Sequence, residues 1–211
     1  SDMTYFLNSL KITETEIEGE FKELYGPDTS FSLLLHSKRG EFEEQYSIGF
    51  QIDKRFVINS SDEGCNLLVG VYINAYNRFA YYRRPLSLVK SHYYNLDDKH
   101  QNLLRDTSFY ENTQLVSHER IYGDDRVSYK VRDRLYLNGS KVYHVQTMLA
   151  NEFDISVSDA VYDSFKILKR DTISLYSRKT SMMLEDLQST DSATFATAKR
   201  FVSEYDFDST E

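Results

Sequence analysis

Cysteine, proline and tryptophan are scarce in this sequence. Its 211 residues include one cysteine, Cys65, two prolines and no tryptophan. A single cysteine excludes an intramolecular disulfide and any metal site made of several thiolates, and it fits a reducing cytosol slightly better than an oxidising compartment. Cys65 lies at the start of an apolar run with no base or oxyanion site beside it. We therefore interpret it as a small core residue rather than a nucleophile.

Glycine is also infrequent, with eight residues in the whole chain, so the backbone can seldom approach a phosphate group closely. The sequence has no glycine-rich phosphate loop, no dinucleotide-binding G-x-G-x-x-G, no H-E-x-x-H, no G-x-S-x-G and no EF-hand loop. These absences remove the usual sequence signatures of nucleotide enzymes, metalloproteases and serine hydrolases. We predict no cofactor and no metal.

Long hydrophobic runs are missing. No stretch approaches the roughly 18 apolar residues of a membrane-spanning helix, and no charged leader precedes an apolar core at the N-terminus. We expect no integral membrane span. Ser1 and Asp2 stand before Met3, which leaves two alternatives: a natural start at Met3, or a mature exported form without its signal peptide. The compartment stays open, with the cytoplasm slightly favoured.

Positive charge is in deficit, because 33 acidic residues face 25 basic ones and the net charge is −8. Neutralising phosphates requires a surplus of Lys and Arg, so a nucleic-acid partner is disfavoured. The acidic balance otherwise concerns solubility.

What is present predicts a folded chain with strands, because 40% of residues are apolar and 14% aromatic. Between residues 31 and 76, short runs of branched and aromatic residues separated by polar breaks predict three or four strands. Residues 127–137 alternate between apolar and polar, which predicts a strand with one buried and one wet face. Asn138-Gly139 then predicts a hairpin with a type I′ turn and a return strand at 141–149.

Two helices are predicted among these strands. Pro85 suits the first position of a helix, and apolar spacing of three and four extends that helix to Asp106. Its predicted buried stripe consists of Leu86, Val89, Tyr93, Leu96, His100 and Leu103. A second helix is predicted at 154–170, with Asp154 or Ser156 as its cap and Val157, Val161, Phe165 and Leu168 on its buried side. A short strand at 173–176 and a terminal helix over 195–205 follow.

The element order predicts an α+β fold, an antiparallel β-sheet packed against helices on both sides. We divide the chain into an acidic N-terminal segment (1–30), an α+β sheet domain (31–176), and a polar linker with a C-terminal helix and acidic tail (177–211). No internal repeat and no Pro/Gly-rich linker is found.

The most unusual stretch is residues 76–91, which hold four basic residues and no acidic one. Arginine beside tyrosine is typical of binding hot spots. The candidate binding residues are Arg78, Phe79, Tyr81, Tyr82, Arg83 and Arg84, and an acidic protein or anionic ligand is favoured over nucleic acid. In the alternative interpretation, Phe79 and Tyr81 pack on the sheet and the arginines pair with the acidic terminal segments.

The five histidines are His36, His92, His100, His118 and His144. His92 and His100 would be roughly 12 Å apart on one helix, too far to share a metal ion, and we expect both to be structural. His118-Glu119 and Asp124-Asp125 flank a predicted turn region. An imidazole near a carboxylate can perform acid–base chemistry, but a solvated turn is the favoured interpretation.

The element order from Leu67 to Leu168 resembles the Mog1/PsbP-like superfamily. The resemblance covers roughly half the chain and rests on the strand at 67–73, the helix from Pro85, and the paired strands around Asn138-Gly139. It also rests on the sequence VSDAVYDSFKIL at 157–168, which is similar to the terminal helix of that superfamily. The resemblance implies an antiparallel sheet with helices on both sides and a role as a partner-binding adaptor or chaperone.

Three functional hypotheses follow. The first is a non-catalytic binding or adaptor/chaperone-like domain that recognises a protein partner. The second is a carrier of a small apolar ligand held between the sheet and the first helix. The third is an uncharacterised hydrolytic enzyme that uses His118, Glu119, Asp124 or Asp125 in one pocket. The oligomeric state stays open.

Overall fold

The computed structural model describes residues 21–36, 40–46, 52–62, 67–97, 102–123, 128–203 and 205. The strands are β1 (Phe21–Tyr25), β2 (Phe31–His36), β3 (Glu43–Tyr46), β4 (Ile52–Asp62), β5 (Leu67–Tyr76), β6 (Asn102–Glu111), β7 (Gln114–Gly123), β8 (Tyr129–Asn138), β9 (Lys141–Ala150) and β10 (Lys166–Ile167). The helices are α2 (Pro85–Asp97), the 3-10 helix η1 (Ile155–Ser158), α3 (Asp159–Ser164), α4 (Thr180–Asp186) and α5 (Ser192–Val202).

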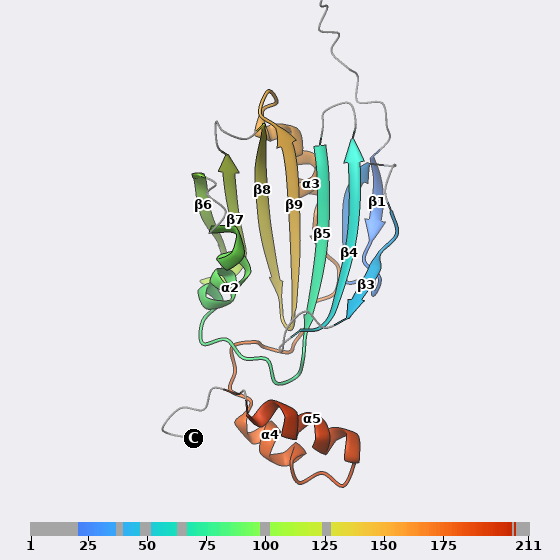
Figure 1. Ribbon diagram of the computed structural model, residues 1–211, viewed down its shortest axis with the longest axis vertical. Helices are drawn as coiled ribbons and strands as arrows, with labels where there is room; N and C mark the ends of the chain where they lie inside the picture. The colour runs from blue at the N-terminus through green and yellow to red at the C-terminus, as the bar shows by residue number, and fades with distance from the viewer. Residues whose placement is uncertain are drawn as a thin grey trace, which may run out of the picture.

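The strands form a seven-stranded sheet in the order β3-β4-β5-β9-β8-β7-β6 and a smaller sheet in the order β1-β2-β10. The strand pairs are antiparallel, which confirms the predicted α+β class with an antiparallel sheet. In Figure 1 helix α2 lies in front of β6 and β7, and α4 and α5 lie beyond the lower end of the sheet. The four strands β2 to β5 confirm the prediction for residues 31–76. No described helix combines the length and apolar character that crossing a membrane requires.

The main core lies between the two sheets. Alternation along β5 turns Val69, Val71 and Ile73 toward the small sheet, where they join Leu33 and Leu35 of β2. Tyr143, Val145 and Leu149 of β9 and Val161 and Tyr162 of α3 belong to the same cluster. The branched residues of the sequence thus form strands because each strand buries one row of them.

Helix α2 covers a second cluster. Leu88, Val89 and Tyr93 pack against Leu135 and Val142 of the sheet. The predicted start at Pro85 is confirmed, and Val89 and Tyr93 are buried as predicted. Leu86 is an error in the predicted stripe, because it is exposed while Leu88 takes the buried position.

The predicted end of this helix at Asp106 is wrong. Helix α2 ends at Asp97, and residues 102–111 form β6, which pairs with β7. The turn between them is Asn112-Thr113, with φ of 47° and 69°. Positive φ at both central residues is the type I′ pattern that suits a two-residue hairpin. Leu103 therefore lies on a strand despite its helical spacing.

The predicted hairpin at Asn138-Gly139 is confirmed, with a different turn. Asn138 pairs with Lys141, so the loop residues are Gly139 and Ser140, and Gly139 alone has a positive φ, 61°. Positive φ at the first loop position is the type II′ pattern. The turn packs on Asp171, whose carboxylate accepts from Ser140 N at 2.9 Å.

The second predicted helix is shorter than expected. Asp154 caps η1 by accepting from Ser156 N, and α3 ends at Ser164. Phe165 is extended and stacks on Tyr136 with 3.8 Å between ring centroids. This stacking redirects the chain into β10, so Leu168 is exposed rather than buried.

The C-terminal part also differs from the prediction. Residues 173–176 form no strand, and the polar stretch after Ser177 contains α4. Helix α5 confirms the predicted terminal helix and is capped by Asp191, whose carboxylate accepts from Thr194 N. Phe79, Met183, Ala198 and Phe201 form a third, smaller cluster.

Substitution of the turn glycine tests this account of the β8–β9 hairpin. Gly139→Ala should lower the free energy of unfolding by about 2 kcal/mol, because alanine resists positive φ and its Cβ would lie 2.6 Å from the Asp171 carbonyl oxygen. Urea denaturation measures the change. Gly40→Ala is the matched control, since the nearest atom to its added Cβ is 3.9 Å away. Equal effects would contradict the assignment of the turn.

Candidate functional site

The segment from Asn77 to Arg84 connects β5 to α2, and we term it the junction segment. Asn77 is buried and shapes its first turn, because its side-chain oxygen accepts from Phe79 N at 2.9 Å and its carbonyl accepts from Ala80 N at 3.1 Å. An asparagine side chain that accepts from the backbone two residues later is a common turn device. This turn directs the backbone from β5 into the junction segment.

The first half of the junction segment faces the C-terminal helices. Phe79 is buried, and its ring lies 5.5 Å from that of Phe201. Arg78 is exposed, yet its guanidinium lies 3.3 Å from the carboxylate of Asp186 and 3.3 Å from the sulfur of Met182. Of the alternative interpretation, the pairing of an arginine with the C-terminal segment is therefore observed for Arg78, and Phe79 packs on helices rather than on the sheet.

The two tyrosines of the junction segment are half-buried. Tyr81 lies 6.0 Å from the ring of Tyr205, and the guanidinium of Arg178 lies over it at 4.7 Å. Tyr82 makes an edge contact with Tyr76 at 5.7 Å, and its backbone N–H donates to the Leu175 carbonyl. Each ring keeps part of its surface accessible.

The second half of the junction segment faces solvent. Arg83 and Arg84 are exposed, as is Lys90 on the following helix. None of these three side chains forms an ion pair with a residue that the structure describes. We term Arg83, Arg84 and Lys90 the basic patch. It lies beside Tyr81 and Tyr82 in the chain and has no acidic residue between its members.

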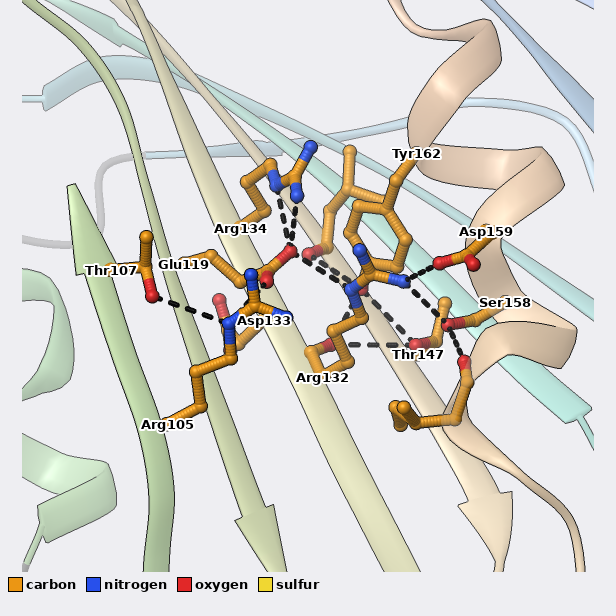
Figure 2. A network of polar contacts seen from close by, with 12 residues as sticks. Arg105, Thr107, Glu119, Arg132, Asp133, Arg134, Thr147, Ser158, Asp159 and Tyr162 are labelled. Atoms are coloured by element: carbon orange, nitrogen blue, oxygen red, sulfur yellow. Dashed lines mark hydrogen bonds and ion pairs between the residues drawn. The ribbon is translucent and has the colours of Figure 1, made fainter. Parts of the chain in front are cut away.

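A second polar feature, which the sequence analysis did not find, is a charge network within the sheet (Figure 2). Glu119 of β7 has no exposed surface. One of its oxygens accepts from Arg132 Nε at 2.8 Å and from Arg134 Nε at 2.8 Å, and Arg105 Nε lies 3.7 Å from the other. One buried carboxylate thus serves three guanidinium groups from β6 and β8.

The same network reaches helix α3. Arg132 donates to Ser158 Oγ at 3.2 Å and to Asp159 at 2.5 Å, and its guanidinium lies 4.2 Å from the ring of Tyr162. Tyr162 in turn donates to the Arg132 carbonyl at 2.6 Å. Arginine keeps its proton in proteins, so the network holds α3 on the sheet and supplies no proton for chemistry.

His118 lies on the opposite face of the sheet from Glu119, because successive residues of a strand point to opposite faces. Ser108 Oγ is 2.9 Å from its Nδ1, and Asp106 Oδ1 is 2.8 Å from its Nε2. The structure therefore does not bring His118 and Glu119 together. Asp124 and Asp125 lie outside the described residues.

The contacts of Ser108 with His118 and of His118 with Asp106 have the hydroxyl–imidazole–carboxylate order of a catalytic triad for acyl transfer. The contact between Asp106 and Nε2 is short enough for an ion pair, although its direction is not that of a regular hydrogen bond. Asp106 also accepts from Arg120 at 3.1 Å, and burial lowers the pKa of His118. Asp106 thus contacts His118 through one oxygen and Arg120 through the other, so it serves an ion pair between β6 and β7 as well as the imidazole.

Of the remaining histidines, His92 joins α2 to the sheet and His144 lies within the sheet. His92 donates from Nδ1 to the Leu88 carbonyl at 3.1 Å and accepts at Nε2 from Asn74 at 3.1 Å. Burial lowers the pKa of His92 to about 4, so the ring is neutral, which fits the structural role expected of it. His144 contacts the buried Asp133 at 2.5 Å. His100 and the side chain of His36 lie outside the described residues.

The described residues contain no group of three or more His, Cys, Asp and Glu side chains that could hold a metal ion. A solvent-open hollow of about 390 Å³ lies at one end of the large sheet, lined by Leu68, Ser128, Tyr129, Met148, Leu149, Ala150 and Glu152. The ligand-carrier hypothesis placed its cavity between the sheet and the first helix. That space is occupied by the packed side chains of Leu88, Val89 and Tyr93.

The sequence matches no protein-family model and none of the curated proteins compared with it. The fold resembles solved structures. A PsbP from the cyanobacterium Synechocystis sp. PCC 6803 is 13% identical, with a TM-score of 0.49 over 76% of this chain and 99% of that one. The Ran-binding protein Mog1p of Saccharomyces cerevisiae is 10% identical, with a TM-score of 0.43 over 72% and 97%. A Bacteroides thetaiotaomicron protein is 12% identical, with a TM-score of 0.37 over 71% and 49%.

Two of these structures carry the names of the superfamily that the element order resembles. Both have TM-scores below 0.5 and identities of 13% or less. Identities of 10–13% carry no information on the function of individual residues. What the junction segment and the charge network do has to be argued from their own geometry.

Loss of the buried carboxylate should destabilise the fold. Glu119→Gln removes the countercharge of half-buried Arg134 and one of the two countercharges of buried Arg132, which should cost about 3–5 kcal/mol. Urea unfolding at neutral pH measures the loss. Asp159→Asn is the matched control, because the Asp159 side chain is 49% exposed and its pair with Arg132 should contribute about 1 kcal/mol or less. A smaller loss in the Glu119 variant than in the Asp159 variant would contradict the central place of Glu119.

Buried His92 should make the protein sensitive to acid. Its pKa is about 4 in the folded chain and about 6.5 when unfolded. Between these values the unfolded chain binds a proton that the folded chain does not, so stability falls as pH drops from 6.5 to 4, by about 3 kcal/mol at most for this group. His92→Gln should reduce the fall measured by urea titrations at neutral and acidic pH. His118→Gln is the comparison, because burial lowers that pKa too. An unchanged pH dependence in the His92 variant would refute the assignment.

Proposed function

We propose that this chain is a non-catalytic protein-binding domain, an antiparallel sheet with helices on both faces that recognises an acidic segment of a partner through the junction segment. The partner-facing residues are Tyr81, Tyr82, Arg83 and Arg84, with Lys90 beside them. Arg78 and Phe79 belong to the same segment and hold it in place against the C-terminal helices. An adaptor or chaperone-like role fits such a surface.

The observation that carries the proposal is the basic patch itself. Three exposed cations lie close to one another in the sequence of a chain of net charge −8, and Arg78 already has the carboxylate of Asp186. Exposed cations attract an acidic partner over distances of roughly one Debye length, about 8 Å at physiological salt. The half-buried tyrosines add apolar area and hydroxyl groups beside these charges, the mixture that binding hot spots use.

The use of the buried polar groups supports a non-catalytic role. Glu119 accepts from arginines, and Asp133 accepts from Gln146 Nε2 at 2.9 Å and contacts His144. The ring of His92 has both nitrogens engaged by Leu88 and Asn74. Two oxygens of this set, Oε1 of Glu119 and Oδ1 of Asp133, accept no hydrogen bond within the described residues, but each lies beside a side chain of the fold, Arg105 at 3.7 Å and His144 at 2.5 Å. A catalytic group, in contrast, keeps a position for substrate. The surface rather than an interior site is therefore where we place the function.

Charge reversal tests the basic patch. Arg83→Glu/Arg84→Glu should reduce recovery of the bound partner several-fold in affinity capture from source-cell extract with identification by mass spectrometry, since each side chain changes from attraction to repulsion. Lys169→Glu/Arg170→Glu is the matched control, an adjacent exposed basic pair in another part of the chain. Wild-type recovery should also fall as salt is raised.

Two outcomes would contradict the proposal. Unchanged recovery by the Arg83/Arg84 variant would remove the junction segment from the interface. An equal loss in the Lys169/Arg170 control would mean that net charge, not this patch, determines capture. Far-ultraviolet circular dichroism of both variants checks that the fold is retained.

A further inference from the structure

Strand β6 forms one margin of the large sheet (Figure 1), and β7 is its single neighbour among the described strands. It is ten residues long, whereas β3 at the opposite margin has four residues and carries Glu43 and Glu44. Short length and charge are the usual means by which a sheet margin avoids pairing with another chain. β6 differs from β3 in its greater length, although it too carries charged residues, Arg105, Asp106 and Glu111.

The side chains of β6 strengthen this contrast. Leu104 is 61% and Tyr110 58% exposed, and Leu103 is exposed as well. The charged residues in the middle of the strand are engaged with β7. Arg105 contacts Glu119, and Asp106 accepts from Arg120. This edge thus presents exposed apolar side chains beside charged residues that each contact an oppositely charged residue of β7.

Two irregularities divide β6 into parts. The pairing with β7 shifts between Leu103 and Arg105 and again between Phe109 and Tyr110. The regular part is therefore Arg105–Phe109, and its central residue is Thr107. Within it, Arg105, Thr107 and Phe109 lie on the face that carries Glu119, because Thr107 is directly opposite Glu119.

We infer that β6 pairs antiparallel with β6 of a second copy of this chain, about a two-fold axis at Thr107. Directly opposite residues share a face of the sheet. With Thr107 opposite Thr107, the two regular parts align over their full length, so that Arg105 lies opposite Phe109 and Leu104 opposite Tyr110. Each contact occurs twice, as the symmetry of a dimer requires.

The other registers that keep the faces matched are worse. An axis at Asp106 sets two carboxylates opposite each other, which is destabilising. An axis at Ser108 sets Leu104 opposite Asn112, beyond the end of the partner strand. In both of these registers, a register shift of one β6 strand would also lie opposite the regular part of the other β6 strand. The register about Thr107 instead places Arg105 opposite the ring of Phe109 in the second copy, where a cation–π contact can form. Within the chain, Arg134 makes such a contact with Phe109 at 4.8 Å.

This dimer does not depend on the proposed function. Its residues lie on β6, and the basic patch lies on the junction segment and α2. Charge reversal at Arg83 and Arg84 consequently has no bearing on the dimer. Failure of one proposal is separable from failure of the other.

Disulfide trapping tests the register. In full-length Cys65→Ser protein, Thr107→Cys should give a covalent dimer on mild oxidation, since directly opposite Cα atoms are about 4.5–5.5 Å apart, within the range of about 4.4–6.8 Å that a disulfide spans. Ser108→Cys is the control on the same strand. Its two copies would be diagonal, about 7–8 Å apart, so dimer should form several-fold more slowly. Equal rates, or no dimer from Thr107→Cys, would overturn the register.

Mass in solution tests the interface without cysteines. Light scattering after gel filtration should give a dimer for the wild-type chain and a monomer for Leu104→Lys. Leu184→Lys is the matched control, because Leu184 is 54% exposed and lies on α4, and it should stay dimeric. A wild-type monomer at the concentrations used for trapping, or a dimer that survives Leu104→Lys, would refute pairing through β6.

Discussion

The burial of Glu119 is the constraint on which the arrangement of the other elements depends. A carboxylate without exposed surface is tolerable only when hydrogen-bonded cations surround it, and here they come from β6 and β8. Arg132 carries the same network to Asp159 and so fixes α3 on the sheet. The end of α3 then determines where Phe165 stacks on Tyr136 and where β10 pairs with β2. A series of contacts therefore connects Glu119, through α3 and β10, to the position of the small sheet on the core.

Strand β8 shows why the sequence could not reveal this network. Its alternation predicted one buried and one wet face, with Arg132 and Arg134 in water. The strand is central, and both faces are covered, so that Arg132 and Asp133 are buried on opposite sides. An arginine pattern looks the same for a solvated face and for a buried ion network, because the partner carboxylate comes from another strand. Only the register with β7, which sets Arg134 opposite Glu119, distinguishes the two.

Where local chemistry determines the structure, the sequence predicted it well. Pro85, the Asn138-Gly139 hairpin and the cap at Asp154 were all found from short-range rules. The end of α2 was missed because Leu103 continues the helical spacing while residues 102–111 gain a backbone ladder with β7 that no short window contains. Helix α4 was missed for a similar reason. Its Met183 is apolar within a polar stretch and is buried only because Phe79 lies opposite it.

The junction segment combines a structural side and an open side, and this division bears on function. Asn77 is buried because its side chain forms the turn that leads from β5 toward α2. Phe79 is buried because it packs against α4 and α5. The backbone on either side of Arg83 and Arg84 is therefore held by the fold, because Tyr82 N donates to the Leu175 carbonyl and Ser87 N donates to the Arg84 carbonyl. A surface that is held in shape before binding loses less conformational entropy when a partner arrives. Composition alone could mark residues 76–84 as unusual, but the packing of Phe79 explains why the exposed part begins at the tyrosines.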